Sequence, residues 1–299
     1  MKLQLIRIVL PAYFCLNPIC VRIIESISEL NRELNSIRAA GKSIGFVPTM
    51  GALHEGHMAL IQRAKQESDC VIATVFINPT QFNNPSDLEL YPRTPKRDIA
   101  LLELNGCDIA FFPSSAEMYP KGLITPEVPL GRLEELMEGA FRPGHFKGVI
   151  QIVYRFFDLI APNKAFFGLK DLQQVAVIQF MVQHLQLAVE IVPCATLRES
   201  NGLAMSSRNE RLSEDQRVEA LHIFQTMQLA QELAEISSPR EVLVQLNSFF
   251  VQSNLKLEYM NLVDPKTLEE LDSEWVPHAR ICIAAYCGDV RLIDNMEVV

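Results

Sequence analysis

From residue 21 to about residue 193, short apolar runs alternate with segments that have the spacing of amphipathic helices. The runs Ile44–Thr49 and Cys70–Asn78 are almost wholly apolar, and the second is rich in β-branched residues. Such runs are typical of strands buried on both faces. A helix is expected between them, over residues 57–68. Further elements are expected at Lys96–Leu104 (helix), Asp108–Phe112 (strand), Ala165–Gly168 (strand) and Gln174–His184 (helix).

Repeated strand-helix-strand units predict a parallel sheet covered by helices, an α/β fold of the doubly wound, Rossmann-like type. Ligands of such sheets bind at the carboxyl ends of the strands. Near residues 193–200 the pattern changes to two long helical stretches followed by strands and turns. We therefore expect an N-terminal extension (1–20), a Rossmann-like domain (21–195) and a smaller α+β domain (196–299), without a flexible linker.

The chain is acidic, with 27 Lys and Arg against 36 Asp and Glu and a net charge of -9. That sign opposes broad electrostatic binding to nucleic acid or to anionic lipid. A small anion can still bind such a protein, but only through a local cluster of donors. The composition therefore predicts a small-molecule protein with no nucleic-acid or membrane partner.

The seven cysteines and the first twenty residues bear on the compartment. An odd number of cysteines without a C-x-x-C pair argues against a disulfide framework or a zinc ribbon. Reduced thiols predict a cytoplasmic protein.

Residues 1–20 begin like an export signal, but Arg7 interrupts the apolar run and Pro11 and Pro18 break it. The run is also too short to span a bilayer, so we interpret it as an extension without an assigned role, or as an early start codon.

A glycine-containing loop follows the strand at Ile44–Thr49 and leads into a helix that begins near His57. The amides and dipole of a helix N-terminus make a ready anion site. The loop is not a Walker A motif, because His57-Met58 stands where Lys and Ser or Thr are needed. The histidines are also three residues apart, rather than the four of a zinc protease. His54 and His57 can instead donate to the same phosphate oxygens during attack at phosphorus, the alternative being two helix-capping histidines without a ligand.

Polar side chains follow two other expected strands. Asn78 and Gln81 carry amides that can both donate and accept, which suits a hydroxy acid. A strand-ending Asn-Pro turn would explain Asn78 but not Gln81. Lys170 and Asp171 follow the strand near residue 168, and lysine suits a triphosphate as a compact positive charge. A solvated surface pair is the alternative for these two residues.

The segment LAMSSRN supplies two hydroxyls and a guanidinium, from Ser206, Ser207 and Arg208. Such groups can hold phosphate oxygens together. No histidine or acid is close in sequence, so a serine nucleophile has little support. A helix cap or a plain loop is the alternative.

Taken together, these segments resemble a known family. The H-x-G-H motif marks the nucleotidyltransferase superfamily, which includes the class I aminoacyl-tRNA synthetases. The wider pattern is similar to the pantothenate synthetase (pantoate–β-alanine ligase) family. The supporting segments, in chain order from Pro48 to Asn295, are PTMGALHEGH, VFINPTQF, YPRT, RPGHFKGV, FGLKDLQQ, LAMSSRN and GDVRLIDN.

The resemblance implies a ligase that condenses pantoate with β-alanine, with ATP as co-substrate and Mg²⁺, through pantoyl adenylate. It implies catalytic roles for His54, His57 and Lys170. ATP-binding roles are implied for Met50, Gly51, His54, Gly56, His57, Gly168, Lys170, Asp171, Leu197, Met205, Ser206, Ser207 and Arg208. Substrate-binding roles are implied for Asn78, Gln81 and Gln174, and a magnesium role for Asp98. The family pattern further implies a homodimer, with the domain at 196–299 acting as a lid.

One position departs from the family pattern. Leu169 stands where the family usually has Glu, and leucine cannot accept a hydrogen bond.

Two alternative functions stay open. A nucleotidyltransferase that keeps the nucleotide in its product shares H-x-G-H but does not call for the paired glutamines. A non-catalytic nucleotide sensor would keep the pocket and lose the chemistry, with Leu169 as its only support.

Overall fold

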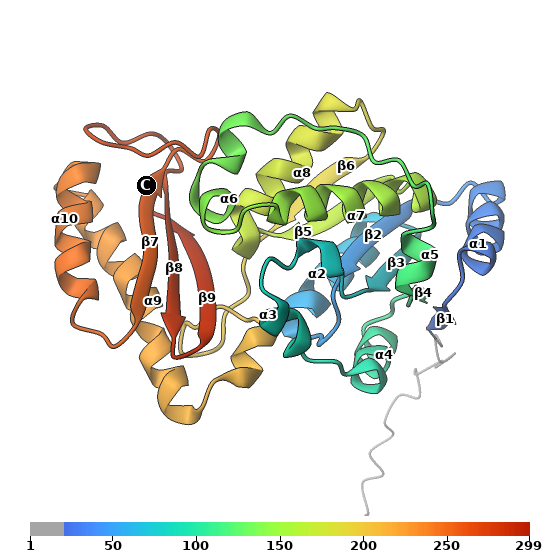
Figure 1. Ribbon diagram of the computed structural model, residues 1–299, viewed down its shortest axis with the longest axis horizontal. Helices are drawn as coiled ribbons and strands as arrows, with labels where there is room; N and C mark the ends of the chain where they lie inside the picture. The colour runs from blue at the N-terminus through green and yellow to red at the C-terminus, as the bar shows by residue number, and fades with distance from the viewer. Residues whose placement is uncertain (1–20) are drawn as a thin grey trace, which may run out of the picture.

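The computed structural model describes residues 21–299 as two neighbouring sheets with their helices (Figure 1). The larger sheet has parallel strands in the order β1-β4-β3-β2-β5-β6. These strands are β1 (Arg22–Ile24), β2 (Ile44–Thr49), β3 (Cys70–Val75), β4 (Ile109–Phe111), β5 (Lys164–Gly168) and β6 (Glu190–Cys194). The predicted doubly wound α/β fold is confirmed. The extension predicted at residues 1–20 lies outside the described residues.

Helices cover both faces of this sheet. The main ones are α1 (Ile27–Ala39), α2 (Glu55–Glu67), α4 (Pro95–Leu104), α7 (His145–Ile160) and α8 (Leu172–His184). Cys70 and Ile72 of β3 pack into the core formed with α1, α7 and α8. Val71 and Ala73 face the opposite core, formed with α2 and α4. Successive residues of a strand point to opposite faces, so a strand covered on both sides has to be apolar throughout.

The crevice for a ligand lies beside β2. Strands β3, β4 and β1 lie on one side of β2, and β5 and β6 lie on the other. The chain order reverses at this point, which opens a crevice at the carboxyl ends of β2 and β5. Two short helices, η1 (Pro79–Gln81) and η3 (Leu169–Asp171), contribute residues to its wall. The other short helices of this part of the chain are α3 (Pro85–Glu89), α5 (Ser115–Met118), η2 (Gly131–Glu134) and α6 (Met137–Phe141).

Several element boundaries differ from the predicted ones by one to three residues, and two of these differences have clear local reasons. The strand predicted to reach Asn78 ends at Val75, because Pro79 has no N–H and begins η1, whose first turn Asn78 caps. The helix predicted from residue 57 begins at Glu55, because the side chain of His54 caps it. Both differences lie at the edge of the crevice, where side chains bond to the backbone.

The C-terminal part of the chain forms an antiparallel sheet in the order β7-β8-β9. Its elements are η4 (Ser207–Arg211), α9 (Glu214–Ala234), α10 (Pro239–Phe250), β7 (Lys256–Val263), β8 (Arg280–Cys287) and β9 (Val290–Glu297). Met227 of α9 and Leu246 of α10 pack with Ile283 of β8 in one core. This confirms the smaller α+β unit, while the boundary between 195 and 196 stays a prediction.

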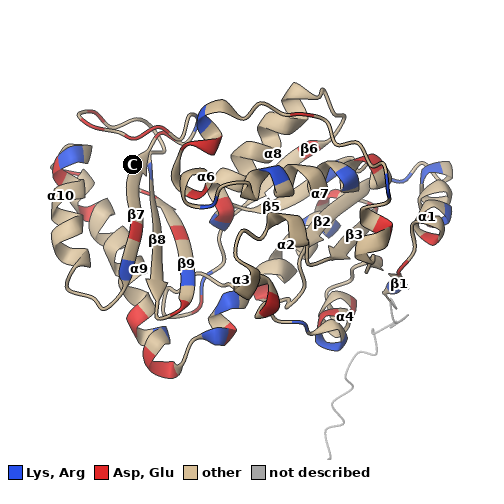
Figure 2. Cartoon of the chain, viewed as in Figure 1, with Lys and Arg blue, Asp and Glu red and all other residues tan. Residues whose placement is uncertain are grey.

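Other sequence predictions concern thiols and charge. Cys70, Cys107, Cys194, Cys282 and Cys287, the cysteines in the described residues, are free thiols. Burial raises the pKa of the Cys107 and Cys282 thiols to about 12, which keeps them protonated. Within residues 21–299, no helix combines the length and apolarity needed to cross a bilayer. Basic and acidic residues are interspersed along the described chain (Figure 2).

Candidate active site

The loop that carries H-x-G-H is folded around Asp98. The carboxylate of Asp98 accepts the backbone N–H groups of Ala52 at 3.2 Å and of Leu53 at 2.8 Å, and the hydroxyl of Thr94 at 3.0 Å. Gly51 has a φ of +81°, and a Cβ there would lie 3.1 Å from Asp98 Oδ2. Asp98 is 1% exposed. It therefore anchors the loop, a role that the sequence did not indicate.

His54 and His57 cap the helix that they begin. His54 Nδ1 accepts the N–H of Gly56 at 3.2 Å, and His57 Nδ1 accepts the N–H of His54 at 3.3 Å. A neutral imidazole whose Nδ1 accepts a hydrogen bond carries its hydrogen on Nε2. The capping arrangement therefore makes both rings Nε2–H donors. The capping and phosphate-donor interpretations of the motif are compatible.

Both imidazoles are neutral at physiological pH. Burial, together with the positive charge of Lys170, lowers the pKa of His54 to about 4. Burial, followed by the neighbouring His54 and Lys170, lowers the pKa of His57 well below its ordinary value. Neutral N–H donors avoid the cost of burying two adjacent cations, and they stand at the positive end of the α2 dipole.

One open cleft gathers the predicted site residues. Its unfilled space is about 1410 Å³, including the part open to solvent, and its walls come from both parts of the chain. Among the described residues, every predicted site residue except Gly51 and Asp98 lines it: Met50, His54, Gly56, His57, Asn78, Gln81, Gly168, Lys170, Asp171, Gln174, Leu197, Met205, Ser206, Ser207 and Arg208.

The amides of Asn78 and Gln81 are oriented by their neighbours. Tyr119 donates its hydroxyl to Asn78 Oδ1, so the Nδ2 of Asn78 faces Gln81 Oε1 at 3.1 Å and the Gly148 carbonyl at 3.1 Å. Gln81 Nε2 is left against Met50 Sδ at 3.0 Å. Thioether sulfur is a weak acceptor, so Gln81 can present Nε2–H to a ligand in the cleft.

The two glutamines of the LQQ segment have different environments. Gln173 is buried, and its amide bonds to the carbonyls of Leu133 and Leu136 and to the N–H of Glu138. Gln174 lines the cleft from α8. Gln173 therefore ties α8 to α6, and Gln174 faces the ligand space, as its predicted role requires.

The backbone next to Lys170 is fixed from β9. The side-chain amide of Asn295 donates to the Leu169 carbonyl at 2.8 Å and to the Lys170 carbonyl at 3.0 Å. Its Oδ1 accepts from Arg280 Nε at 3.0 Å, which sets the direction of the amide. Since the contact involves main-chain oxygens, it holds η3 in place whatever side chain occupies position 169.

The LAMSSRN segment crosses from the C-terminal part to the H-x-G-H loop. Ser207 Oγ donates to the carbonyl of Ala52 at 3.0 Å. Arg208 pairs with Asp87 of α3 at 2.7 Å, and Arg211 reaches the same carboxylate at 3.3 Å. These contacts hold the two halves of the chain together across the cleft.

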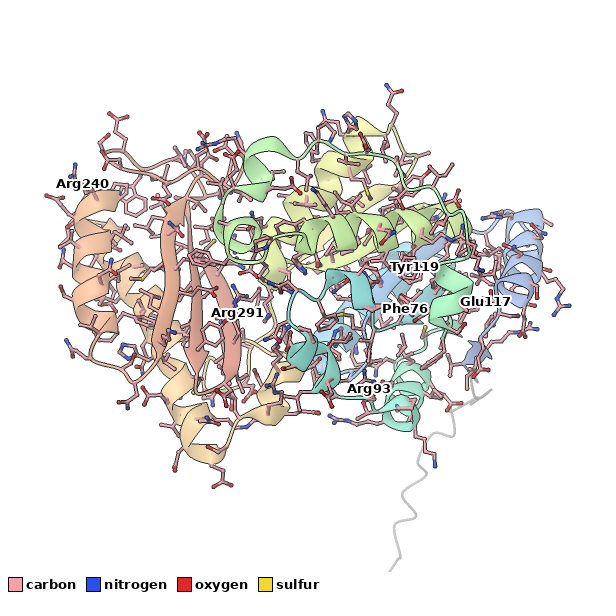
Figure 3. The ribbon with its side chains drawn as sticks, in the orientation of Figure 1. Phe76, Arg93, Glu117, Tyr119, Arg240 and Arg291 are labelled. Carbon is pink, nitrogen blue, oxygen red and sulfur yellow. The ribbon has the colours of Figure 1, made fainter. Side chains whose placement is uncertain are left out.

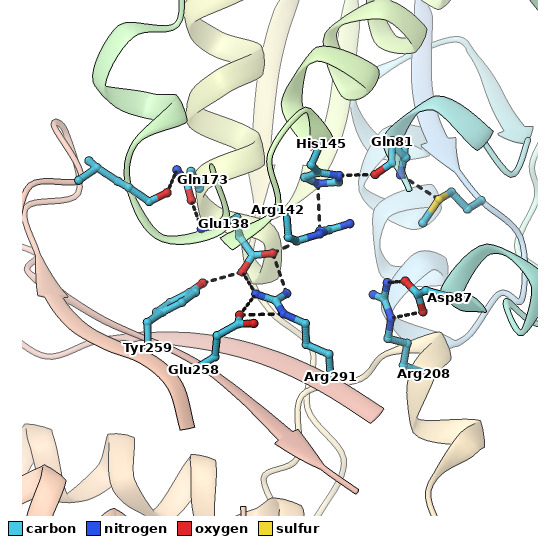
Figure 4. Close-up of polar contacts among 12 residues, drawn as sticks. Gln81, Asp87, Glu138, Arg142, His145, Gln173, Arg208, Glu258, Tyr259 and Arg291 are labelled. Carbon is cyan, nitrogen blue, oxygen red and sulfur yellow. Dashed lines mark hydrogen bonds and ion pairs between the residues drawn. The ribbon is translucent and has the colours of Figure 1, made fainter. Parts of the chain in front are cut away.

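Arg142 and Glu138 were not singled out from the sequence as site residues, whereas His145 of the RPGHFKGV segment was expected either to line the site or to fix its loop. Arg142 and His145 line the cleft, and Glu138 binds Arg142 at 3.2 Å (Figure 4). Burial and the charge of Arg142 lower the pKa of His145 to about 4. Arg142 and His145 both lie in the quoted RPGHFKGV segment. A buried acid-base pair four residues apart on a short helix carries no signal in the sequence alone.

A metal site made of protein groups alone is not evident. In residues 21–299, no cluster of three or more His, Cys, Asp or Glu side chains is arranged to hold a metal ion. Asp98, the predicted magnesium residue, already accepts three hydrogen bonds. Its magnesium role stays a prediction.

Comparison with known proteins gives a consistent result. The family model described as pantoate-beta-alanine ligase matches residues 22–297. A pantothenate synthetase from Bacteroides fragilis is 45% identical over 280 residues, covering 93% of this chain and 99% of the relative. Another from Porphyromonas gingivalis is 46% identical over 283 residues, covering 93% and 99%.

Solved structures agree with these relatives. The pantothenate synthetase of Thermus thermophilus superposes with a TM-score of 0.88 at 42% identity, covering 93% of this chain and 99% of that one. A pantoate-beta-alanine ligase from Francisella tularensis, complexed with beta-gamma ATP and beta-alanine, has a TM-score of 0.78 at 36% identity, covering 93% and 97%. The chain therefore belongs to the pantoate-beta-alanine ligase family and is a ligase.

Proposed function

We propose that this chain condenses pantoate with β-alanine to form pantothenate, converting ATP to AMP and pyrophosphate through a pantoyl-adenylate intermediate. Family membership supports pantothenate formation. The observation that carries the finer proposal is the position of two neutral Nε2–H imidazoles, His54 and His57, in the same cleft as the amides of Gln81 and Gln174. The first pair suits a phosphate and the second a hydroxy acid.

In the first step, a carboxylate oxygen of pantoate forms a bond to the α-phosphorus of ATP. The bond from that phosphorus to the bridging oxygen breaks, and pyrophosphate leaves. Negative charge shifts among the phosphate oxygens as this happens. The Nε2–H groups of His54 and His57, aided by the dipole of α2, would stabilise that charge without reorienting.

The remaining ATP contacts would come from both sides of the cleft. Lys170 supplies a compact charge for the phosphates, and Ser206, Ser207 and Arg208 approach from the C-terminal part. The other residues proposed for ATP binding are Met50, Gly51, Gly56, Gly168, Asp171, Leu197 and Met205. Mg²⁺ would accompany ATP, held mainly by phosphate oxygens and water, because the oxygens of Asp98 are engaged by the loop.

Pantoate would be held by uncharged amides. Gln81 and Gln174 orient it, and Asn78 fixes the direction of Gln81. Amides leave the carboxylate a better nucleophile than a fixed positive charge would, since a strong ion pair stabilises the ground state. In the second step, the β-alanine amine forms a C–N bond to the acyl carbon, loses a proton and releases AMP.

Water has to be excluded while the mixed anhydride exists. We assign this to the proposed domain 196–299, which closes over the ATP- and pantoate-binding domain 21–195. The bonds from Ser207 to Ala52 and from Arg208 to Asp87 are the contacts that such closure would use. We further propose that the chain works in the cytoplasm as a homodimer, and light scattering of the purified protein tests the dimer.

One assay separates this function from its two alternatives. The full chain is incubated with ATP, Mg²⁺, pantoate and β-alanine. Pantothenate with an equimolar amount of AMP is expected for the ligase. A stable nucleotidylated product would indicate a nucleotidyltransferase, and ATP binding without turnover would indicate a sensor. Omitting β-alanine should leave pyrophosphate exchange intact, because adenylate formation precedes the use of the amine.

A further inference from the structure

Glu138 of α6 binds the C-terminal sheet and the cleft wall at the same time. Arg291 of β9 donates to both of its oxygens, at 2.7 Å and 2.9 Å, and Tyr259 of β7 donates its hydroxyl at 2.8 Å (Figure 4). Arg142, which lines the cleft, donates to the same carboxylate at 3.2 Å. Residues from β7, β9 and the cleft wall therefore meet at one side chain.

This cluster is enclosed and electrically balanced. The side chains of Glu138, Arg142 and Arg291 are 9%, 14% and 16% exposed. Glu258 supplies the second carboxylate, at 2.9 Å from Arg291 Nε. Burial alone would raise the pKa of Glu138, but Arg291 and Arg142 lower it to about 2. Buried ion pairs are costly to break, because the remaining partner keeps its desolvated charge.

A chain of contacts continues from Glu138 to Gln81, the residue proposed to bind pantoate. Arg142 Nη1 lies 3.1 Å from His145 Nε2, and His145 Nδ1 lies 2.7 Å from the backbone carbonyl of Gln81. Arg142 can only donate and the carbonyl can only accept. The imidazole therefore accepts on Nε2 and donates from Nδ1, which requires the neutral ring. The direction of every hydrogen bond from Arg142 to Gln81 is thereby determined.

We propose that Glu138 is a positioning residue, through which docking of the C-terminal sheet sets the placement of Gln81 in the cleft. The inference rests on the proposed function, because it takes Gln81 to bind pantoate. Arg291 holds Glu138, Glu138 holds Arg142, and Arg142 with His145 holds the backbone of η1. Without the carboxylate, the guanidinium of Arg142 has no partner on the α6 side and turns into the cleft.

The packing of η1 makes Gln81 sensitive to this restraint. A Cβ at Gly148 of α7 would lie 2.3 Å from the Thr80 carbonyl, so η1 and α7 are in close backbone contact. The α7 side therefore leaves no space into which η1 could shift. Small shifts of η1 would instead move the Gln81 amide relative to Asn78 and the cleft.

The test uses Glu138→Gln, which keeps the shape and removes the charge, and Arg291→Met, which removes the link to β9. Arg240→Met is the matched control: Arg240 lies in the same part of the chain as Arg291 (Figure 3), but its side chain is 77% exposed and its partner Asp272 is 3.8 Å away. Initial rates are measured in the full chain against pantoate and ATP separately. Circular dichroism gives the folded fraction of each variant.

For Glu138→Gln we expect the KM for pantoate to rise about tenfold or more and kcat to fall by up to about 100-fold, as for a misplaced binding group. The KM for ATP should change less than about twofold. Arg291→Met should also raise the KM for pantoate more than the KM for ATP, but to a smaller extent. Arg240→Met should change neither KM value. A purely structural role would lower kcat in step with the folded fraction at unchanged KM values.

Three results would overturn the inference. They are a fall in kcat that only follows the folded fraction, an equal rise in the KM values for pantoate and ATP, and kinetics like those of Arg240→Met. If Glu138→Gln fails to fold, Arg291→Lys replaces it, because lysine keeps the charge but loses the bidentate contact. We then expect the same result, a larger rise in the KM for pantoate than in the KM for ATP. Wild-type protein that forms no pantothenate would overturn the proposed function instead, which keeps the two failures apart.

Discussion

The side chain of His57 accepts the backbone N–H of His54 at 3.3 Å, and the two rings lie with their centroids 4.1 Å apart. One residue of the motif thus holds the main chain of the other. The same bond that caps α2 leaves the Nε2–H of His57 for the cleft. Helix capping and the proposed donation to phosphate therefore use opposite sides of the His57 ring, and a substitution can separate them.

Replacing His57 by Asn separates these uses. The Asn Oδ1 can still accept the His54 N–H, but no donor remains at the position of Nε2. We expect the helix cap to survive and adenylate formation to fall by about 10²–10³, the effect of removing one transition-state donor. Pyrophosphate release measures the rate. His57→Ala should lose the same activity and about 1 kcal/mol of unfolding free energy as well. Near-normal turnover in either folded variant would remove His57 from the mechanism.

Asp98→Asn tests the loop anchor against the predicted magnesium role. An asparagine amide turns donors toward backbone N–H groups that need acceptors. We expect the unfolding free energy to fall by about 1–3 kcal/mol, measured by urea denaturation. The Mg²⁺ concentration for half-maximal rate should stay unchanged. Unaltered stability combined with a higher Mg²⁺ requirement would support direct magnesium binding instead.

Asn295→Ala removes the two bonds to the carbonyls of Leu169 and Lys170. We expect a higher KM for ATP, because the main chain that carries Lys170 loses its support. Asn261→Ala is the matched control, since Asn261 is also in the C-terminal sheet but bonds only to the exposed Glu270 side chain at 2.6 Å. Steady-state kinetics at varied ATP compare the two. If both variants keep the wild-type KM, η3 does not depend on Asn295.

Stability should depend on pH between about 6.5 and 4. In the folded protein, burial with nearby positive charge lowers the pKa of His54 and of His145 to about 4, whereas the unfolded chain has the ordinary value of 6.5. In this window the unfolded state binds protons that the folded state does not. The unfolding free energy therefore falls as pH falls, by up to about 1.4 kcal/mol per pH unit for each histidine.

Urea unfolding without ligand from pH 5 to 8 measures this slope. His145→Asn should make it shallower, because one of the titrating groups is gone while an amide donor to the Gln81 carbonyl remains. The matched comparison is His278→Asn, at an exposed histidine paired with Glu297 at 2.7 Å. An identical slope in His145→Asn and wild type would contradict a neutral buried His145.

The sequence predicted well what depends on pattern, and poorly what depends on long-range side-chain contacts. The alternation of apolar runs gives the parallel sheet, because strands covered on both faces must be apolar. The cleft at β2 and β5 follows from that topology, and His54, Gln81 and Lys170 line it as expected. Residues 1–20 lie outside the described structure, so the extension stays a prediction.

Other features depend on contacts between residues far apart in the chain. The magnesium role of Asp98 stays a prediction, but no pattern in the sequence indicated that its oxygens accept the backbone N–H groups of residues 52 and 53. The ion pair of Glu138 and Arg291 joins residues 153 positions apart. No local period or spacing encodes such a pair. It is visible only when α6 and β9 lie side by side.

The bonds from Ser207 to Ala52 and from Asn295 to η3 also affect how the protein is made. Domains fold during synthesis from the N-terminal side, as units. The sheet that carries H-x-G-H can form as soon as β6 has left the ribosome, but the phosphate side of the cleft is complete only after β9 has been translated and docked. A nascent or prematurely ended chain would then have a folded sheet with an incomplete cleft, so the proposed reaction with ATP would begin only after β9 has docked.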